Sequence, residues 1–187
     1  LATAQNALGS AYSFKAVDNV HIPDREPPYL IKVGTTVTSM QAGTPATYSG
    51  TVTLTFNESL YCMDELPGSS GVGDEDTLRP VINRGYGAND KNDNPTMTSI
   101  LTMIGNPSEI KSKSNSTATT RTFTLEFVNI TNGYQIILPT SMVLSDAAMN
   151  STSDAFILEF QAGAGEGGFI TGSGQFVVVR GDYRPEN

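Results

Sequence analysis

The chain has 187 residues, 38% of them hydrophobic, and a formal net charge of -8. This length suffices for one domain with a buried core, or for one domain with an appended strand or small lobe. Nucleic acid is excluded as an expected partner, because phosphate binding requires clustered Lys and Arg and the 11 cations are scattered along the sequence.

Charged residues make up only 16% of the chain, and 18 glycines and 10 prolines supply many turns. This composition is typical of an exposed β protein rather than a helical one, and it suits an extracellular or cell-surface location. No apolar run approaches the length of a membrane span, so no span is expected. The chain begins with Leu1 instead of methionine, which indicates a processed product or a piece of a longer chain.

The first predicted element is a strand within residues 1–19, which read LATAQNALGSAYSFKAVDN. A later stretch, LSDAAMNSTSDAFILEF, repeats its order of an asparagine, a short polar step and an alanine followed by an aromatic residue. Alternation puts Tyr12, Phe14 and Ala16 on one face, and these are predicted interface residues. The strand either ends a preceding module or is a donor strand that completes a neighbouring subunit's sheet, because strand addition exploits an open edge.

A linker is predicted over residues 20–28, VHIPDREPP. Its two consecutive prolines cannot sit in a central strand, and they hold the chain extended. The only histidine, His21, lies here and is expected to be a surface or interface residue rather than a catalytic base.

Residues 29–187 are expected to form the body of the protein, because stretches with a period of two recur along them. In GTVTLTF, Val52, Leu54 and Phe56 alternate with threonines, as in strands with one buried face. RTFTLEF and AFILEF show the same alternation, and YLIKV, YQIIL and GQFVVVRGD are further apolar runs. Short strands at a spacing of roughly ten residues predict an all-β fold, namely an antiparallel Ig-like β-sandwich.

Helical signals are poor along the whole body. The stretch MTSILTMIG fits either a strand or a short helix, and its Thr, Ile and Ser content favours a strand. One short helical turn is expected near DEDTLRPVI.

The final apolar run belongs to a predicted C-terminal strand extension, residues 161–187. Its apolar face, represented by Phe176 and Val178, is predicted to be part of a contact surface. The run ends in the letters RGD at residues 180–182, an integrin-recognition tripeptide. We favour a turn at this point, in which Gly181 lets the chain bend after the strand.

Three stretches, DREPPYLIKV, SGTVTLTFNESLY and FTLEFVNITNGYQIILPTSMVLSDAAMNSTSDAFILEF, together resemble the bacterial Ig-like modules of surface-layer and cell-wall proteins. The resemblance covers residues 24–160. Met149 stands where that family often has glycine, and residues 161–187 extend past its usual final strand. The resemblance implies a structural or adhesive module, usually in tandem, that carries no shared catalytic site.

A long polar loop between residues 67 and 94 carries the sharpest ligand hypothesis. Its stretch NDKNDNP offers oxygen-bearing side chains at alternate positions, as in the first half of a calcium loop. An EF-hand is excluded because proline replaces the turn glycine and Leu101 replaces the closing glutamate, and a solvated acidic loop is the simpler interpretation. The candidate calcium ligands are Asp90, Asn92, Asp93 and Asn94.

Asparagine side chains carry two further predictions. Asn150 and Asp146, in SDAAMN, are expected to support a tight turn by bonding to nearby backbone amides rather than to bind metal. Four N-x-S/T sequons also mark candidate glycosylation sites. These acceptors are Asn57, Asn115, Asn129 and Asn150.

No convergent set of catalytic residues is visible, so no enzyme activity and no cofactor other than calcium are expected. The single cysteine, Cys62, is expected to be a small buried hydrophobe. The sequence favours a non-catalytic extracellular structural or adhesive module that assembles end to end. It would be a tandem surface-protein module or a filament subunit that donates its N-terminal strand, with other copies or adjacent modules as partners. The alternative is a carbohydrate-binding β-sandwich with a cell-surface glycan partner, which would rely on the seven tyrosines because Trp is absent.

Overall fold

The described part of the chain is built almost entirely from β-strands. A short helix, α1 (Met97–Met103), is the exception among these residues. The structure is a computed structural model, and it describes residues 3–5, 11–13, 24–63, 78–81, 97–103, 109–112, 121–138, 144–152, 154–164 and 170–186.

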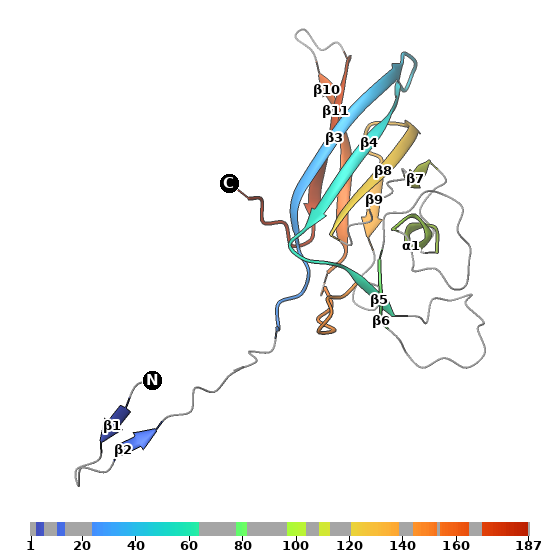
Figure 1. The fold of residues 1–187 in the computed structure, drawn as a ribbon. Helices are drawn as coiled ribbons and strands as arrows, with labels where there is room; N and C mark the ends of the chain where they lie inside the picture. The colour runs from blue at the N-terminus through green and yellow to red at the C-terminus, as the bar shows by residue number, and fades with distance from the viewer. Residues whose placement is uncertain are drawn as a thin grey trace, which may run out of the picture.

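Two antiparallel sheets form the body and pack face to face (Figure 1). The larger sheet has the order β3-β4-β8-β7, with β3 (Leu30–Gln41), β4 (Thr47–Phe56), β8 (Thr122–Ile130) and β7 (Ile110–Ser112). The smaller sheet has the order β11-β10-β9, with β11 (Ile170–Arg180), β10 (Phe156–Ala164) and β9 (Gln135–Leu138). The predicted all-β antiparallel sandwich is confirmed, and β11 is the strand predicted in the C-terminal extension.

The predicted N-terminal strand is present as a hairpin of two short strands. Strand β1 (Thr3–Gln5) pairs antiparallel with β2 (Ala11–Ser13), and Tyr12 lies opposite Ala4. Among the described strands, β1 and β2 pair only with each other. The other two predicted interface residues of this segment, Phe14 and Ala16, lie outside the described residues.

Burial alternates along β4, β9 and most of β8 as the sequence predicts. In β4, Val52, Leu54 and Phe56 are fully buried, and the threonines between them are half-buried. On that outer face the hydroxyl oxygens of Thr53 and Thr124 lie 3.3 Å apart across β4 and β8. One face of the larger sheet is therefore apolar core, and the other is lined by hydroxyl groups.

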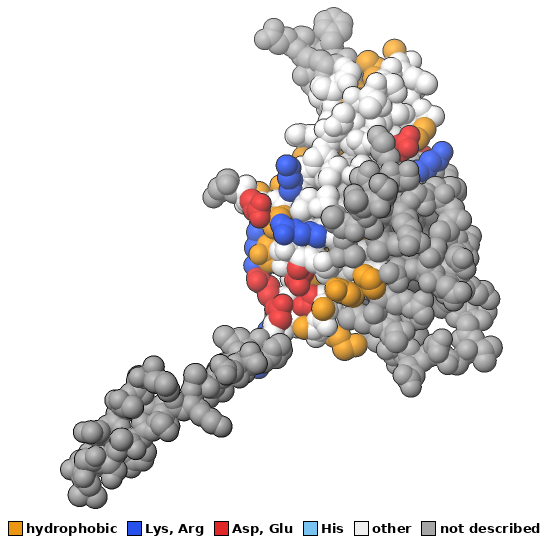
Figure 2. Space-filling model, in the orientation of Figure 1, with side chains coloured by type: hydrophobic (Ala, Val, Ile, Leu, Met, Phe, Trp, Pro, Cys, Tyr) orange, Lys and Arg blue, Asp and Glu red, His pale blue; other side chains and the backbone are white. Residues whose placement is uncertain are grey.

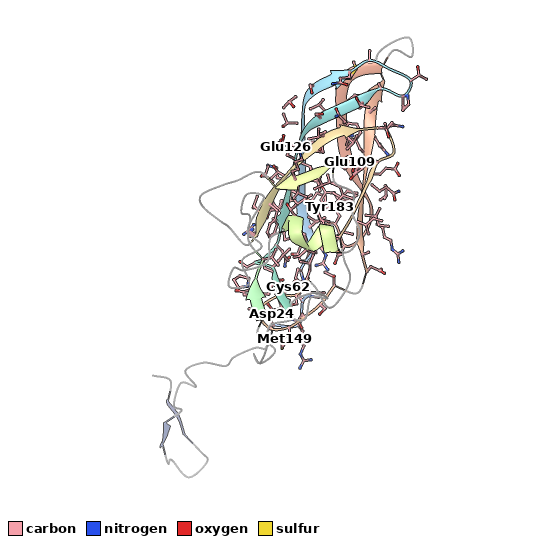
Figure 3. All side chains as sticks on the ribbon, turned by 90° about the vertical axis from the view of Figure 1, so that its right-hand side faces the viewer. Asp24, Cys62, Glu109, Glu126, Met149 and Tyr183 are labelled. Carbon is pink, nitrogen blue, oxygen red and sulfur yellow. The ribbon has the colours of Figure 1, made fainter. Side chains whose placement is uncertain are left out.

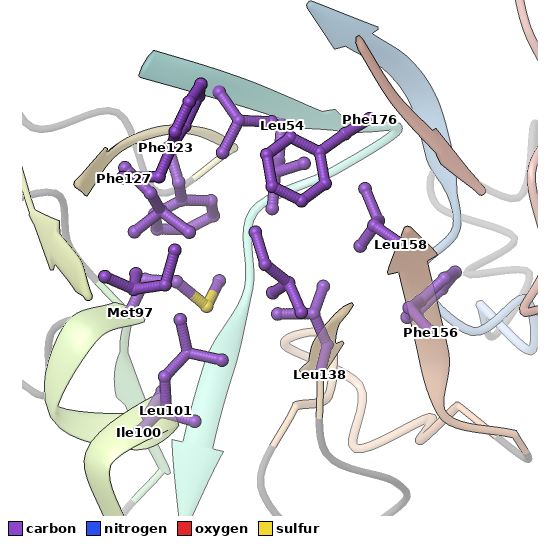
Figure 4. Close-up of a cluster of buried hydrophobic side chains, with 14 of the residues drawn as sticks. Leu54, Met97, Ile100, Leu101, Phe123, Phe127, Leu138, Phe156, Leu158 and Phe176 are labelled. Carbon is purple, nitrogen blue, oxygen red and sulfur yellow. The ribbon is translucent and has the colours of Figure 1, made fainter. Parts of the chain in front are cut away.

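Aromatic rings hold the two sheets together in the core (Figure 4). The Phe160 ring of β10 lies 5.1 Å from the Tyr48 ring of β4 and 5.7 Å from the Phe127 ring of β8, measured between centroids. Nearer the other end of β10, the Phe156 ring meets the Phe56 ring edge-on at 5.8 Å. Each such pair contributes about 0.5–1.5 kcal/mol beyond the burial of its surface, so the rings fix how the sheets face each other.

The preference for a strand in MTSILTMIG is wrong, because helix α1 occupies this stretch. Met97, Ile100 and Leu101 are all buried, and their side chains join the core cluster (Figure 4). These positions are spaced i, i+3 and i+4, which places them on one face of a helix. The gain from burying that face outweighs the weak β propensity of Thr and Ile.

The expected helical turn near DEDTLRPVI is also wrong in its described part, which forms a strand. Strand β6 (Leu78–Pro80) pairs antiparallel with β5 (Tyr61–Met63), and Cys62 lies opposite Arg79. Cys62 is 1% exposed, which confirms the prediction of a buried thiol. Pairing with a strand distant in sequence overrides the local helical signal here.

A glycine pair on β11 tests how closely the Phe160 ring packs over β11, its neighbouring strand in the smaller sheet. A Cβ atom at position 174 would lie 2.3 Å from the Phe160 ring, whereas the space around Gly172 is open. We expect Gly174→Ala to lower the free energy of unfolding by about 1–3 kcal/mol through overpacking. Gly172→Ala should leave it unchanged or raise it by about 0.4–1 kcal/mol, since alanine restricts the unfolded chain. Urea unfolding measures both variants, and equal losses would contradict the packing of Phe160 over β11.

Candidate functional site

The chain enters and leaves the sandwich at the same place. The entry segment, residues 24–29, leads into β3, and the exit segment, residues 181–186, follows β11. Tyr183 forms a parallel bridge with Leu30, the first residue of β3. We name this region the junction; it comprises residues 24–30, 57–58, 144–152 and 181–186.

Charged side chains gather at the junction (Figure 2). The guanidinium of Arg184 donates to both carboxylate oxygens of Asp182, at 3.0 and 2.7 Å, and also to the carboxylate of Glu26. The same group lies over the Tyr29 ring, 4.1 Å from its centroid. The hydrogen bonds to Asp182 and Glu26 raise the pKa of Arg184 further, so the residue stays charged at every accessible pH. Arg184 thus joins the exit segment to the entry segment.

Side chains of the neighbouring turns hold the backbone of the entry segment. The backbone amide of Tyr29 donates to Asn57 Oδ1 at 2.8 Å, and Asn57 Nδ2 donates to Glu58 Oε1 at 2.9 Å. Asn150 Nδ2 donates to the carbonyl oxygen of Asp24 at 3.0 Å. These hydrogen bonds therefore fix the direction in which residues 24–29 lead into the sandwich.

The turn predicted around Asp146 and Asn150 is confirmed. Asp146 is 1% exposed, and its carboxylate accepts hydrogen bonds from the Asn150 amide nitrogen at 2.8 Å and from Asn150 Nδ2 at 2.6 Å. Met149 has a φ of 67°, a conformation that glycine adopts at no steric cost, and glycine is the residue often found here in the modules that this stretch resembles. Met149 and Asp24 both lie at the junction end of the body (Figure 3).

Three carboxylates converge at the junction. The ligand oxygens of Asp24, Glu58 and Asp146 all lie within 4.8 Å of one another. Burial raises the pKa of the Glu58 carboxyl, and the nearby charges of Asp146, Asp24 and Glu26 raise it further, while the hydrogen bond from Asn57 acts in the opposite direction. Oxygen ligands at such spacing can hold a hard divalent cation, or can share a proton.

This acidic cluster differs from the calcium site predicted from the sequence. Asp90, Asn92, Asp93 and Asn94 lie outside the described residues. The sequence analysis named Asp146 but missed Asp24 and Glu58 as its neighbours. Both stand in stretches that carry the family resemblance, DREPP and FNESL, but nothing in their spacing brings them together.

A groove of about 270 Å³ opens beside the exit turn. Its acidic residues already have partners, since Asp154 pairs with Arg180 at 3.1 Å and Asp182 pairs with Arg184. Arg180 and Asp182, the charged residues of the RGD tripeptide, are therefore both paired within the chain. Gly181 between them has a φ of 110°, which fits the predicted turn. The lining residues are Pro27, Pro28, Thr152, Asp154, Phe156, Gly181 and Asp182.

The predicted contact face of the last strand is turned into this chain's own core. Phe176 is 4% exposed and meets the rings of Phe127 and Phe160 at 5.5 and 5.4 Å. Val178 is partly buried against the same core. Burial in the sandwich accounts for the apolar character of both residues, so neither side chain is free to contact a partner while the sandwich is closed.

The described sequons differ in how their asparagines are used. The side-chain amides of Asn57 and Asn150 donate hydrogen bonds that hold the junction together. Asn129 is exposed on β8 with a φ of 55°, and its backbone amide bonds to Ser49. Asn115 lies outside the described residues. Among the described acceptors, only a glycan on Asn129 would leave the junction contacts intact.

No family model, curated protein or solved structure matches the chain. The likeness to bacterial Ig-like modules therefore remains a prediction from short motifs. Within the described residues, no helix is long and apolar enough to cross a membrane. Functional inference for this protein depends on the geometry of the junction.

The raised pKa of Glu58 predicts a pH-dependent stability effect. Because the folded state holds the proton more tightly than the unfolded chain, the ionised carboxylate opposes folding above its ordinary pKa of 4.5. Glu58→Gln should therefore raise Tm at pH 7, and the gain should vanish as the pH falls below 4.5. Thermal unfolding followed by circular dichroism measures this, with the exposed Glu126→Gln as control. A gain that is the same at both pH values would contradict the explanation.

Asn150 is expected to stabilise the junction by satisfying the buried Asp146 carboxylate. Asn150→Ala removes the 2.6 Å hydrogen bond to Asp146 and the bond to the Asp24 carbonyl. The free energy of unfolding should fall by about 1–3 kcal/mol, the usual effect of leaving a buried polar group unpaired. Gln161→Ala, at an exposed amide on β10, should change it by less than about 0.5 kcal/mol. Similar values for the two variants in urea unfolding would rule out this role.

Proposed function

We propose that this chain is a non-catalytic extracellular β-sandwich module with a structural or adhesive role, which assembles with copies of itself or with adjacent modules. The observation that supports this proposal is the junction. Its hydrogen bonds fix the direction in which residues 24–29 enter the sandwich. A fixed entry direction serves a protein that must hold its body at a defined angle to a neighbour.

The geometry of the junction also bears on the mode of assembly. In a string of modules threaded end to end, entry and exit lie at opposite ends of each sandwich. Here the Arg184–Glu26 ion pair and the Leu30–Tyr183 bridge bring entry and exit together. This arrangement favours a body that projects sideways from its point of attachment, with contacts to neighbours made through the N-terminal region.

The N-terminal segment supplies the proposed contact. Its stretch AYSFKAV alternates apolar and polar residues, as a strand added to another sheet requires. Among the described strands, β2 (Ala11–Ser13) pairs only with β1, and neither strand pairs with a sheet of the body. In such a contact, the N-terminal strand of one copy binds a different surface of the next copy. Repeated contacts of this kind produce a fibre unless the copies close into a ring.

Deletion of residues 1–17 tests the proposal. The full chain should form oligomers or filaments that light scattering and negative-stain electron microscopy detect, and the deleted chain should remain monomeric. Thermal unfolding of the sandwich should be unchanged, because no strand pairing among the described residues joins the hairpin sheet to the body sheets. Unchanged assembly after the deletion would refute the N-terminal contact.

A pair of point variants provides a matched control for the deletion. Phe14→Asp places a charge on the predicted apolar face, whereas Ser13→Asp places the same charge on the opposite face. Assembly should be lost in the first variant and retained in the second. Equal effects would show that the charge itself, rather than the face, decides the outcome.

A further inference from the structure

The exit segment runs beside the edge of the larger sheet and joins it through one parallel bridge, Leu30–Tyr183. We name residues 182–186 the tail, and residues 30–31 of β3 the acceptor edge. Leu30 donates its amide hydrogen to the Asp182 carbonyl at 3.0 Å, and the Arg184 amide donates to the Leu30 carbonyl at 2.9 Å. The Glu186 amide completes the pairing with the Ile31 carbonyl at 3.4 Å. The first two bonds follow the pattern of a parallel β ladder around the Leu30–Tyr183 bridge, whereas the third reaches Ile31 instead of Lys32 and is out of that register.

The tail can pair on one side only. The amides of residues 184 and 186 point toward β3, so the amide position of Pro185 faces away from it. Proline has no amide hydrogen, and therefore its place in the tail costs no ladder bond. It also prevents a further strand from adding to the outer side of the tail. The tail can therefore form backbone hydrogen bonds with one sheet edge at a time.

The tail is held by its backbone and by surface charges, not by the core. Every residue from 182 to 186 is exposed. Its main side-chain contacts are the half-exposed ion pair of Arg184 with Glu26 and the cation–π contact with Tyr29. Exposed ion pairs contribute little stability. The tail itself therefore places no residue in the hydrophobic core.

The acceptor edge, in contrast, requires a partner. Leu30 is completely buried and Ile31 is 6% exposed with the tail in place, and the tail's backbone hydrogen bonds satisfy the groups of this edge. Buried backbone amides and carbonyls that lose their partner carry a large desolvation penalty. When the tail leaves, water or a second tail can satisfy the freed groups, and only a second tail also restores the burial of Leu30 and Ile31.

We propose that the tail exchanges between copies, so that the acceptor edge of one chain binds the tail of a second copy. Every contact in trans repeats one made within the single chain, as in domain swapping. Glu26 and Tyr29 recognise the incoming Arg184, and Gly181 is the hinge. The chain's own tail competes for the acceptor edge at an effective concentration on the order of millimolar. This inference therefore rests on the proposed function, which brings copies to a comparable local concentration. Exchange competes with the chain's own tail when copies are already held side by side.

Cross-linking between two single-cysteine variants tests the exchange. Lys32→Cys lies on β3 beside the acceptor edge, and Glu186→Cys lies at the end of the tail; both positions are exposed, whereas the native Cys62 is buried. One variant carries an affinity tag, and the two are mixed at high concentration with a short bifunctional thiol reagent. We expect mixed dimers whose yield rises with concentration. Gln41→Cys, at the exposed far end of β3, replaces Lys32→Cys as the control for random collisions.

Two further arms make the outcome specific. Adding Arg184→Ala to the tail variant should reduce the yield of mixed dimer, because the tail with Arg184 on the acceptor chain then competes better for the edge. An excess of the peptide DYRPEN should also compete the dimer away, while DYAPEN should not. Mixed dimers no more frequent than in the control, or unaffected by either arm, overturn the exchange.

The two proposals fail separately. Assembly that survives deletion of residues 1–17 refutes the N-terminal contact, whatever the tail does. Absence of the specific cross-link in chains that still assemble refutes the tail exchange alone. Thermal unfolding of each cysteine variant confirms that the sandwich is folded before the comparison is made.

Discussion

The contact between aromatic rings across the two sheets is the interaction on which the rest of the structure depends. The Phe160 ring contacts Tyr48 and Phe127 of the larger sheet, and also Phe176 of its own, smaller sheet. Because the chain has a single cysteine, Cys62, no disulfide within the chain can replace this contact. Because the rings fix how the sheets face each other, they also fix where β3 begins and where β10 and β11 run. The junction is assembled from the ends of these strands.

Much of the fold could be predicted because the physical signal is local. Alternation along GTVTLTF and AFILEF marks a strand with one buried face, and burial in β4 and β10 follows it residue by residue. Helix α1 carried a local signal too, in the spacing of Met97, Ile100 and Leu101. Propensity favoured a strand there and was outweighed by packing. Strand β6 had no comparable signal, since its pairing partner lies on a different stretch of chain.

The candidate site was predicted only in part, for the same physical reason. The bond between Asp146 and Asn150 spans four residues, so the turn chemistry of these side chains was enough to predict it. The contacts of Asp24 with Asn150 and of Glu26 with Arg184 span 126 and 158 residues. No spacing rule connects positions so distant, and only the folded sheets bring them together. Phe176 shows a related limit: an apolar pattern predicts burial, but not whether the same chain or a partner supplies the cover.

The parallel direction of the tail beside β3 has a mechanical consequence. Consider a force that pulls residue 24 and residue 186 apart. It acts in opposite directions on two neighbouring segments that run parallel, the start of β3 and the tail. The three backbone hydrogen bonds between tail and edge would then bear the load together, in shear, instead of opening one after another. Tension along the chain would thus meet the junction before it reached the aromatic core.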